Sequence, residues 1–309
     1  MSSPVFLSIL IPVYNWDIGP LLDRLCRQGQ RLPDGVQVEI LVLDDGSTTK
    51  TKHANASLAE QLPLVHYEES AVNRGRAATR NALLKQAQGE FVLFLDADML
   101  PDREDFLRMY LEQGDQGAEI VCGGISYEQN NHNRPEYDFY LYKSRHTEAL
   151  TAEIRNRSPW RYLFTSNIMV RRDIVESVRF DPRFTGYGFE DIEWGIRLSR
   201  SYTVLHIDNT CSHMGVMTKK EVMAKMRESI PNFSLLIGLH PAETGRAGAA
   251  RPAFVLRCWP DVLLLSADRL LTALFFALRW NPLLFYLFQG HKALLLAREI
   301  KKTSRGGLA

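Results

Sequence analysis

The stretch that decides the fold runs from Phe91 to Asp98 and reads Phe-Val-Leu-Phe-Leu-Asp-Ala-Asp. Five apolar residues in succession are typical of a strand that is buried on both faces of a parallel sheet. In an extended backbone, residues two apart point to the same side, so Asp96 and Asp98 are expected to present their carboxylates together at the strand end. Carboxylate oxygens suit Mg2+ or Mn2+. The alternative for so short a pattern is a solvated loop.

Two further apolar runs, residues 5–13 and 38–43, precede this strand and also end in polar residues. The other predicted strands lie at 65–67, 120–125, 164–170 and 203–207, and the predicted helices lie at 19–28, 76–88, 136–155 and 191–198. Such alternation predicts a doubly wound α/β sheet, in which ligands bind beyond the carboxyl ends of the strands. The polar residues that follow the first three runs therefore mark the expected site.

Length and composition limit the domain organisation, the partners and the location that we expect for this protein. With 309 residues the chain can bury one large core, so we expect a main domain at residues 1–250 and an extension at 251–309. The 37 Lys and Arg residues nearly balance the 36 Asp and Glu residues, which argues against nucleic acid as a partner. The four cysteines lack metal-ligand spacing, and no secretory signal is visible, so we expect a cytoplasmic protein.

Polar residues near the second run and the next helix suit a nucleotide. Asp45 has the chemistry to accept from a base N–H and a ribose hydroxyl, although Asp-Gly-Ser is also a common turn or helix cap. Arg74, Arg76 and Arg80 surround the start of the following helix, and guanidinium groups recognise phosphates with a fixed fork geometry. For Arg80, a structural ion pair is an equal alternative.

Four motifs occur in order: Ile-Pro-Val-Tyr-Asn at 11–15, Asp-Asp-Gly-Ser at 44–47, Asn-Arg-Gly-Arg-Ala-Ala-Thr-Arg-Asn at 73–81 and Asp-Ala-Asp at 96–98. Together they resemble the family 2 glycosyltransferases of the GT-A fold, which implies an α/β fold with a mixed sheet flanked by helices. The resemblance also implies roles for single residues. Pro12, Val13, Tyr14 and Asp45 would hold a uracil-type base, Arg76 would lie near the base or phosphate, Asp96 would meet the ribose, and Asp98 would ligate the metal.

The second half contains Gly-Tyr-Gly-Phe-Glu-Asp-Ile-Glu-Trp-Gly at residues 186–195. This segment resembles the acceptor-side motif of inverting family members, including galactosyltransferase-like relatives, which implies Asp191 as the catalytic base and Glu190 as a ligand of sugar hydroxyls. A helix cap is the alternative for both. The resemblance further implies that His213 is a metal ligand, although a lone histidine is more often structural. Asn167 falls where relatives line the donor sugar pocket, or is a turn residue.

These inferences predict a metal-dependent inverting glycosyltransferase with Mn2+ or Mg2+ as cofactor and a UDP-sugar as donor. The expected acceptor is a hydroxyl of a carbohydrate or lipid-linked molecule, in surface polysaccharide or glycolipid synthesis. A nucleotidyltransferase, which joins a similar sheet to metal carboxylates, is one alternative. A catalytically silent nucleotide-sugar binding or scaffold protein is another, and Asp96, Asp98 and Asp191 argue against it.

The C-terminal extension is strongly apolar from residue 254 to residue 297, but its longest uncharged stretches are too short to span a bilayer. Pro260 and Pro282 favour two helices at about 261–279 and 283–302. On the first helix the polar residues form a narrow stripe and leave a broad apolar arc. Packing on protein and an interfacial contact of residues 254–302 with the inner face of the cell membrane are equal alternatives.

Overall fold

The computed structural model describes residues 7–48, 50–132, 134–245 and 248–306. The chain divides into two compact units. The first unit comprises Met1–Asn131, Arg145–Pro182 and Trp194–Gly215, and the second comprises His132–Ser144, Arg183–Glu193 and Val216–Ala309. The predicted extension at 251–309 lies within the second unit, and its boundary at residue 250 remains a prediction.

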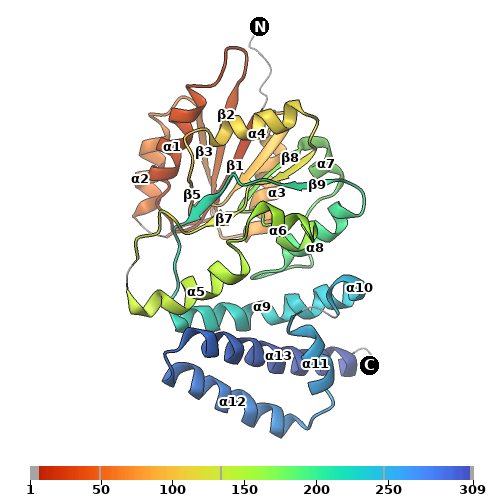
Figure 1. Cartoon of the computed structure of the whole chain (residues 1–309). Coiled ribbons are helices and arrows are strands. Elements are labelled where there is room, and N and C mark those ends of the chain that lie inside the picture. Colours follow the sequence, from red (N-terminus) through yellow and green to blue (C-terminus); the bar gives the residue numbers. More distant parts are fainter. Residues whose placement is uncertain (1–6, 49, 133, 246–247, 307–309) are drawn as a thin grey trace. The chain divides into compact units, whose positions relative to one another are not determined.

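A seven-stranded mixed sheet forms the centre of the first unit (Figure 1). Its strand order is β3-β2-β1-β4-β8-β6-β9, with bounds β1 Leu7–Val13, β2 Val38–Asp44, β3 Val65–Glu69, β4 Phe91–Leu95, β6 Ile120–Cys122, β8 Asn167–Arg171 and β9 Val204–His206. Strands β1 to β4 run parallel, whereas β8 is antiparallel to both β4 and β6. The predicted α/β fold with a mixed sheet is confirmed.

Helices cover this sheet because its central strands, such as β1 and β4, are buried along nearly their whole length. Helices α3 (Arg76–Gln86) and α7 (Arg172–Ser177) pack onto one face in a core that includes Leu10, Phe94 and Val170. Side chains alternate along a strand, so Ile9 and Ile11 point to the opposite face, and both are fully buried. The unit also contains α1 (Gly19–Gly29), α2 (Thr51–Ala59), α4 (Phe106–Asp115), α6 (Ala152–Asn156) and the 3-10 turn Pro159–Tyr162.

A second, three-stranded sheet in the first unit joins distant segments of the chain. Strand β10 (Cys211–His213) pairs antiparallel with β5 (Met99–Pro101) and parallel with β7 (Ile125–Ser126). The prediction of one strand at 120–125 was wrong, because β6 and β7 belong to different sheets. Gly123 and Gly124 separate them, and Gly124 has a φ of 91°, which is unfavourable for other residues.

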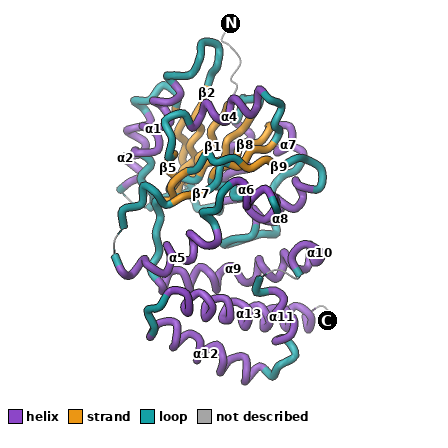
Figure 2. The backbone as a smooth tube through the Cα atoms, viewed as in Figure 1, coloured by secondary structure: helices purple, strands orange, loops and turns teal. Residues whose placement is uncertain are grey.

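The C-terminal part of the second unit consists of helices, drawn in purple in Figure 2, with short connections in teal. These helices are α9 (Lys219–Leu239), α10 (Pro241–Thr244), α11 (Ala250–Leu256), α12 (Asp261–Ala277) and α13 (Asn281–Gly306). The two predicted C-terminal helices are confirmed, with Pro282 in the first turn of α13. Helix α9 was not predicted, although Thr218 and Glu221 form a capping box at its start.

Two helices cross the boundary between the units, α5 (Asp138–Thr147), which follows the 3-10 turn Pro135–Tyr137, and α8 (Glu190–Ser199). The prediction of a continuous helix at 136–155 was wrong, because α5 ends at Thr147 and α6 begins only at Ala152. In the described part of the chain, no helix is both long enough and apolar enough to cross a membrane.

Candidate functional site

The tips of β1 and β2 are tied to each other by backbone and side-chain hydrogen bonds. The amide of Asp45 donates to the carbonyl of Val13 at 2.8 Å, and the amide of Asn15 donates to Ser47 Oγ at 2.7 Å. Asn15 adopts a φ of 51°, which is uncommon outside glycine. Tyr14, between these anchors, is 51% exposed. The strand end thus holds a fixed backbone that presents one aromatic side chain to solvent.

The carboxylate of Asp45 holds the loop that leads into α3. Its Oδ1 accepts from the amide of Arg74 at 2.8 Å, and its Oδ2 accepts from the amide of Gly75 at 2.9 Å. Asp45 is buried at 5% exposure. The predicted base-binding residue therefore also fixes the position of Arg76, the first residue of α3. Pro12 is partly buried beside these tips.

Asp96 lies at the end of β4 and forms an ion pair with a buried arginine. Arg80 Nη2 lies 2.8 Å from Asp96 Oδ1, and the Arg80 side chain is only 1% exposed against 18% for Asp96. Burial by itself raises the pKa of Asp96, but the guanidinium groups of Arg80 and Arg76 outweigh burial and hold this pKa below its ordinary value. The structural alternative for Arg80 is thus supported, and Asp96 is ionised.

Residues 96–98 form a turn and not the extended segment that the sequence suggested. The amide of Met99 donates to the carbonyl of Asp96 at 3.1 Å, which closes the turn. As a consequence, Asp96 and Asp98 have different partners. Asp98 Oδ2 lies 3.3 Å from Nε2 of His213, and the two side chains are 25% and 19% exposed. The predicted metal ligands Asp98 and His213 are therefore brought together, although 115 positions separate them in the sequence.

Gly215 leaves the space into which this pair projects. A Cβ at position 215 would lie 2.7 Å from Asp98 Oδ2 and 3.2 Å from His213 Cε1, both closer than ordinary contact. The amide of Met214 donates to the carbonyl of Asp98 at 2.8 Å, so the backbone is held close on this side. Among the described residues there is no group of three or more His, Cys, Asp or Glu side chains that could hold a metal. Asp98 and His213 thus form a two-residue pair.

Asp102, which the sequence analysis did not single out, holds the three-stranded sheet together. Its Oδ2 accepts from Ser126 Oγ at 2.6 Å and Thr210 Oγ1 at 2.7 Å, and its Oδ1 accepts from Ser212 Oγ at 2.5 Å and Gln129 Nε2 at 2.9 Å. These donors come from β7, from β10 and from the residues beside them. Because His213 pairs with Met99 in this sheet, Asp102 fixes the register that places His213 beside Asp98.

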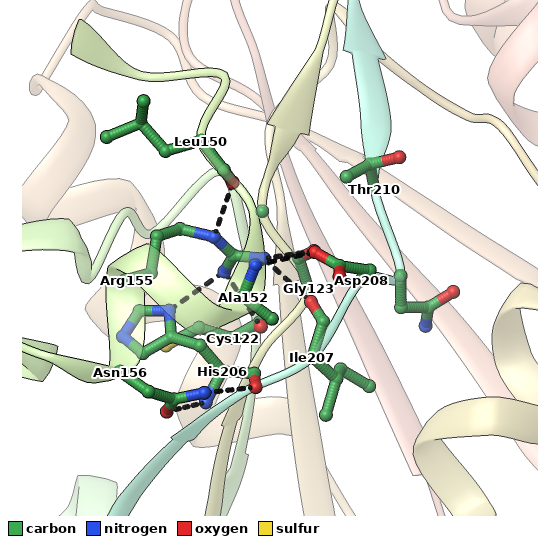
Figure 3. Close-up of polar contacts among 12 residues, drawn as sticks. Cys122, Gly123, Leu150, Ala152, Arg155, Asn156, His206, Ile207, Asp208 and Thr210 are labelled. Atoms are coloured by element: carbon green, nitrogen blue, oxygen red, sulfur yellow. Dashed lines mark hydrogen bonds and ion pairs between the residues drawn. The ribbon is translucent and has the colours of Figure 1, made fainter.

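A second residue missed from the sequence, Arg155, anchors the chain just before β10 (Figure 3). Its guanidinium is fully buried and donates to the carbonyls of Cys122 and Gly123 at 3.2 Å each and of Ile207 at 2.8 Å. A buried cation is costly unless it is hydrogen-bonded, and these carbonyls meet that need. Arg155 therefore fastens the end of β6 and the start of the connection that leads to His213.

His206 completes the Arg155 cluster. Arg155 Nη1 lies 2.8 Å from His206 Nδ1, and His206 Nε2 lies 3.0 Å from the carbonyl of Pro159. Because arginine cannot accept a hydrogen bond, Nδ1 is the acceptor and the ring proton is on Nε2. Burial and the neighbouring guanidinium lower the pKa of His206 to about 4. His206 is thus a buried structural residue, with 2% of its surface exposed.

Glu190 and Asp191 begin α8 after a turn with an unusual backbone. Three of the four residues 186–189 have a left-handed backbone, with φ of 74° at Gly186, 86° at Gly188 and 72° at Phe189. For phenylalanine this conformation costs about 1–3 kcal/mol, and its ring stacks on Phe233 at 4.5 Å between centroids. Asp191 Oδ1 accepts from the amide of Ile192 at 2.8 Å.

Asn167 and Trp194 both occupy buried structural positions. Asn167 is 2% exposed, accepts from Tyr110 Oη at 2.7 Å and donates to the carbonyls of Gly124 and Asn209 at 2.9 Å. The expectation that it lines a sugar pocket was wrong, because its amide is consumed within the core. Trp194 is fully buried and packs its ring on Phe180 at 4.5 Å between centroids.

The comparison with known families decides the class of the protein. A family model described as "Glycosyl transferase family 2" matches residues 8–179, which is more than half of the chain and includes the tips of β1, β2 and β4. The chain belongs to glycosyl transferase family 2. The predicted family and the predicted class of enzyme, a glycosyltransferase, are confirmed.

Curated proteins that are similar to this family 2 glycosyltransferase match a larger share of the chain than the family model does. The uncharacterized glycosyltransferase YfnE of Bacillus subtilis is 26% identical over 246 residues, covering 63% of this chain and 60% of that protein. Validoxylamine A glucosyltransferase of Streptomyces hygroscopicus is 29% identical over 220 residues, covering 62% of this chain and 51% of that protein. The chain thus spans about half to three-fifths of the length of these relatives.

Solved structures support the GT-A fold. The mannosyltransferase PcManGT from Pyrobaculum calidifontis, in complex with GDP-Man and Mn2+, has a TM-score of 0.58 at 20% identity and covers 97% of this chain and 89% of that chain. TarS 1-349 of S. aureus, in complex with UDP, has a TM-score of 0.52 at 18% identity and covers 98% of this chain and 92% of that chain. At these identities the likeness concerns the fold alone.

Proposed function

We propose that this protein is a metal-dependent inverting glycosyltransferase that moves a sugar from a UDP-sugar to a hydroxyl of a carbohydrate or lipid-linked acceptor. The observation that carries the proposal is the Asp98–His213 pair beside an ionised Asp96 at the end of a central strand. The proposed setting is the synthesis of surface polysaccharide or glycolipid on the cytoplasmic side of the membrane. Family membership supports sugar transfer. The metal and the UDP donor are tested by the experiments below.

Asp98 and His213 are the proposed ligands of Mn2+ or Mg2+. Carboxylate oxygen and imidazole nitrogen are both compatible with Mn2+. Magnesium sites in nucleotide enzymes use one or two protein carboxylates together with substrate phosphates and water, so a two-residue pair fits this chemistry. The space beside Gly215 also fits, since a side chain there would meet both residues. When bound, the metal would supply positive charge for the departing diphosphate.

The nucleotide is proposed to bind along the tips of β1, β2 and β4. Tyr14 is exposed and offers a ring for stacking on the base, while Pro12 and Val13 supply backbone and Asp45 a carboxylate for its polar edge. Arg76 would lie near the base or phosphate and Asp96 near the ribose. The neighbour structures hold GDP-Man in one case and UDP in the other, so the base is tested directly below.

Asp191 is the proposed base and Glu190 a proposed ligand of donor or acceptor hydroxyls. In the proposed single displacement, the acceptor oxygen forms a bond to the anomeric carbon, the bond from that carbon to the diphosphate breaks, and Asp191 takes the acceptor proton. The left-handed backbone at Phe189 supports this role, because such conformations cluster at functional sites. Asn232 donates to the carbonyl of Gly188 at 2.9 Å and steadies the turn.

The first experiment measures UDP and GDP release from a panel of nucleotide sugars with Mn2+, with Mg2+ and with a chelator. We expect metal-dependent UDP release that is lost in Asp98→Ala and strongly reduced in Asp191→Asn. Asp115→Asn, at an exposed carboxylate at the end of α4, is the matched control and keeps wild-type release. Release of GDP in place of UDP would overturn the proposed donor, and full release with the chelator would overturn the proposed metal.

Two further measurements, of pyrophosphate release and of nucleotide-sugar binding, separate the two alternatives. A nucleotidyltransferase would release pyrophosphate from a nucleoside triphosphate and a sugar phosphate. A silent binding or scaffold protein would bind the nucleotide sugar without hydrolysis or transfer, even with membrane extracts added as a source of acceptor. The ionised Asp96 and the Asp98–His213 pair favour the enzyme over the scaffold.

A further inference from the structure

Helix α12 carries its apolar residues on the outside. Val262 is 72% exposed, Leu263 52%, Leu270 60% and Phe276 48%. A surface helix of a globular protein normally turns its apolar stripe toward the core and its polar residues toward water. On α12 the exposed surface has the composition that is expected of a buried one.

The side of α12 that faces the protein is polar at its centre. Asp268 is 8% exposed, and its Oδ1 lies 2.7 Å from Nδ1 of His291 on α13, which is 1% exposed. Thr272, one turn further on, donates through Oγ1 to the carbonyl of Asp268 at 2.8 Å. Figures 1 and 2 show α13 beside α12 along its length. The other buried residues of α12 are Leu264 and Phe275. The helix is therefore apolar on its inner and outer sides, and its outer apolar side chains have no cover from α13.

The exposed apolar surface extends beyond α12. Thirteen large hydrophobic side chains are exposed in the described part of the chain, and ten of them lie between residues 255 and 286. Trp259 and Trp280 stand just outside the two ends of α12 and are 46% and 67% exposed. Contiguous apolar surfaces of this kind mark interaction sites, and tryptophans at their margins are typical of contacts with a membrane interface.

Positive charge gathers in the same segment. Residues 251–309 contain nine Lys and Arg against three Asp and Glu, whereas residues 1–250 contain 28 against 33. Arg257 lies two residues before Trp259, and Arg279 lies directly before Trp280. Arg269 is exposed near the middle of α12. The one acidic residue exposed on α12, Asp261, is paired with Lys301 at 2.6 Å. A near-neutral chain thus has a strongly cationic apolar segment.

We propose that the outward face of α12, with the flanking Trp259 and Trp280, docks on the surface of an anionic lipid bilayer. Apolar side chains would enter the boundary between headgroups and acyl chains, and Arg257, Arg269 and Arg279 would meet lipid phosphates. A second copy of the chain fits less well, because a symmetric dimer would bring two such cationic faces together. The docking itself does not rest on the proposed sugar transfer, whereas its use in reaching lipid-linked acceptors does.

The test is flotation of the full-length protein with vesicles of phosphatidylcholine alone or mixed with phosphatidylglycerol. The wild type binds the anionic vesicles at least about tenfold more tightly than the neutral ones, and high salt weakens this binding. The double variant Val262→Glu/Leu270→Glu loses at least about tenfold of the affinity, because two charges are placed in the apolar face. Val72→Glu, at a position of the first unit that is 62% exposed, is the matched control and binds like the wild type.

Circular dichroism and thermal unfolding establish that the double variant is folded, as expected for substitutions at such exposed positions. Absence of binding to anionic vesicles overturns the proposal, as does equal binding by the double variant. Sedimentation without lipid tests the second-copy alternative, since a dimer that the same substitutions dissociate would assign the face to that contact. UDP release from soluble donor is measured in parallel, so failure of docking is distinguished from failure of the proposed enzyme function.

Discussion

Replacing Gly215 by alanine tests the proposed metal ligands without removing either of them. The new Cβ would lie 2.7 Å from Asp98 Oδ2, while ordinary contact begins at 3.4 Å. The carboxylate must therefore move by about 0.7 Å, and His213 Cε1, at 3.2 Å, must give way slightly as well. Ligand distances at metal sites tolerate only about ±0.2 Å, so the displacement is large for coordination.

The same substitution is mild for the fold. Gly215 does not have a left-handed backbone, and the atom that the Cβ meets first is the end of a side chain. A Gly→Ala change at a compatible backbone stabilises a protein by about 0.4–1 kcal/mol through the unfolded state, which offsets the local crowding. We expect the free energy of unfolding to change by less than about 1 kcal/mol and the Mn2+ affinity to fall by about 10- to 100-fold.

Isothermal titration calorimetry with Mn2+, alone and with UDP, measures the affinity directly, and chemical denaturation measures the stability. Gly238→Ala is the control, because a Cβ there meets nothing within 4 Å and the position lies within α9. It is expected to leave Mn2+ binding unchanged and to stabilise the helix by up to about 1 kcal/mol. Wild-type Mn2+ affinity in folded Gly215→Ala would refute the assignment of Asp98 and His213 as ligands.

Three further substitutions test the surroundings of the site. Asp102→Asn removes the charged acceptor that four donors share, so the free energy of unfolding measured by denaturation should fall by about 1–3 kcal/mol. Calorimetry should show a weaker Mn2+ affinity, and an unchanged affinity would limit Asp102 to a structural role. Arg80→Met leaves Asp96 without its buried partner, so the free energy of unfolding should fall by about 3–5 kcal/mol. An unchanged free energy of unfolding would contradict this. His206 has a pKa of about 4 in the folded protein, so between pH 6.5 and 4 its imidazole gains a proton only in the unfolded chain. From pH 7.5 to 5 the free energy of unfolding of the wild type should therefore fall by about 2 kcal/mol more than that of His206→Gln. Parallel pH profiles of the two proteins would disprove this.

The sequence predicted the parts of the fold that depend on local pattern. The strands β1, β2 and β4 are runs of consecutive apolar residues, and each is followed by the polar residues that later proved to lie at the strand tip. The two C-terminal helices were predicted from the positions of Pro260 and Pro282. In each case a few neighbouring residues determine the backbone, so a single sequence is enough.

The connections that assemble the site were not predicted, because they join residues that are far apart in the chain. Asp102 is one carboxylate among many, and only the structure shows that Ser126 and Ser212 both donate to it. The extended backbone expected at 96–98 is replaced by a turn for a similar reason, since Asp96 is drawn to Arg80 and Asp98 lies beside His213. The motifs therefore indicated which residues matter but not what holds them in place.

The three-stranded sheet determines when the site is completed during synthesis of the protein. His213 lies 34 residues beyond the end of the segment that matches the family model. During synthesis the nucleotide half emerges first and can begin to fold while β10 is still in the ribosome, and contacts between distant residues form late because long loops must close. A nascent chain that stops at residue 179 would carry Asp98 without His213. If these two residues hold the metal as proposed, metal binding reports that synthesis has passed β10.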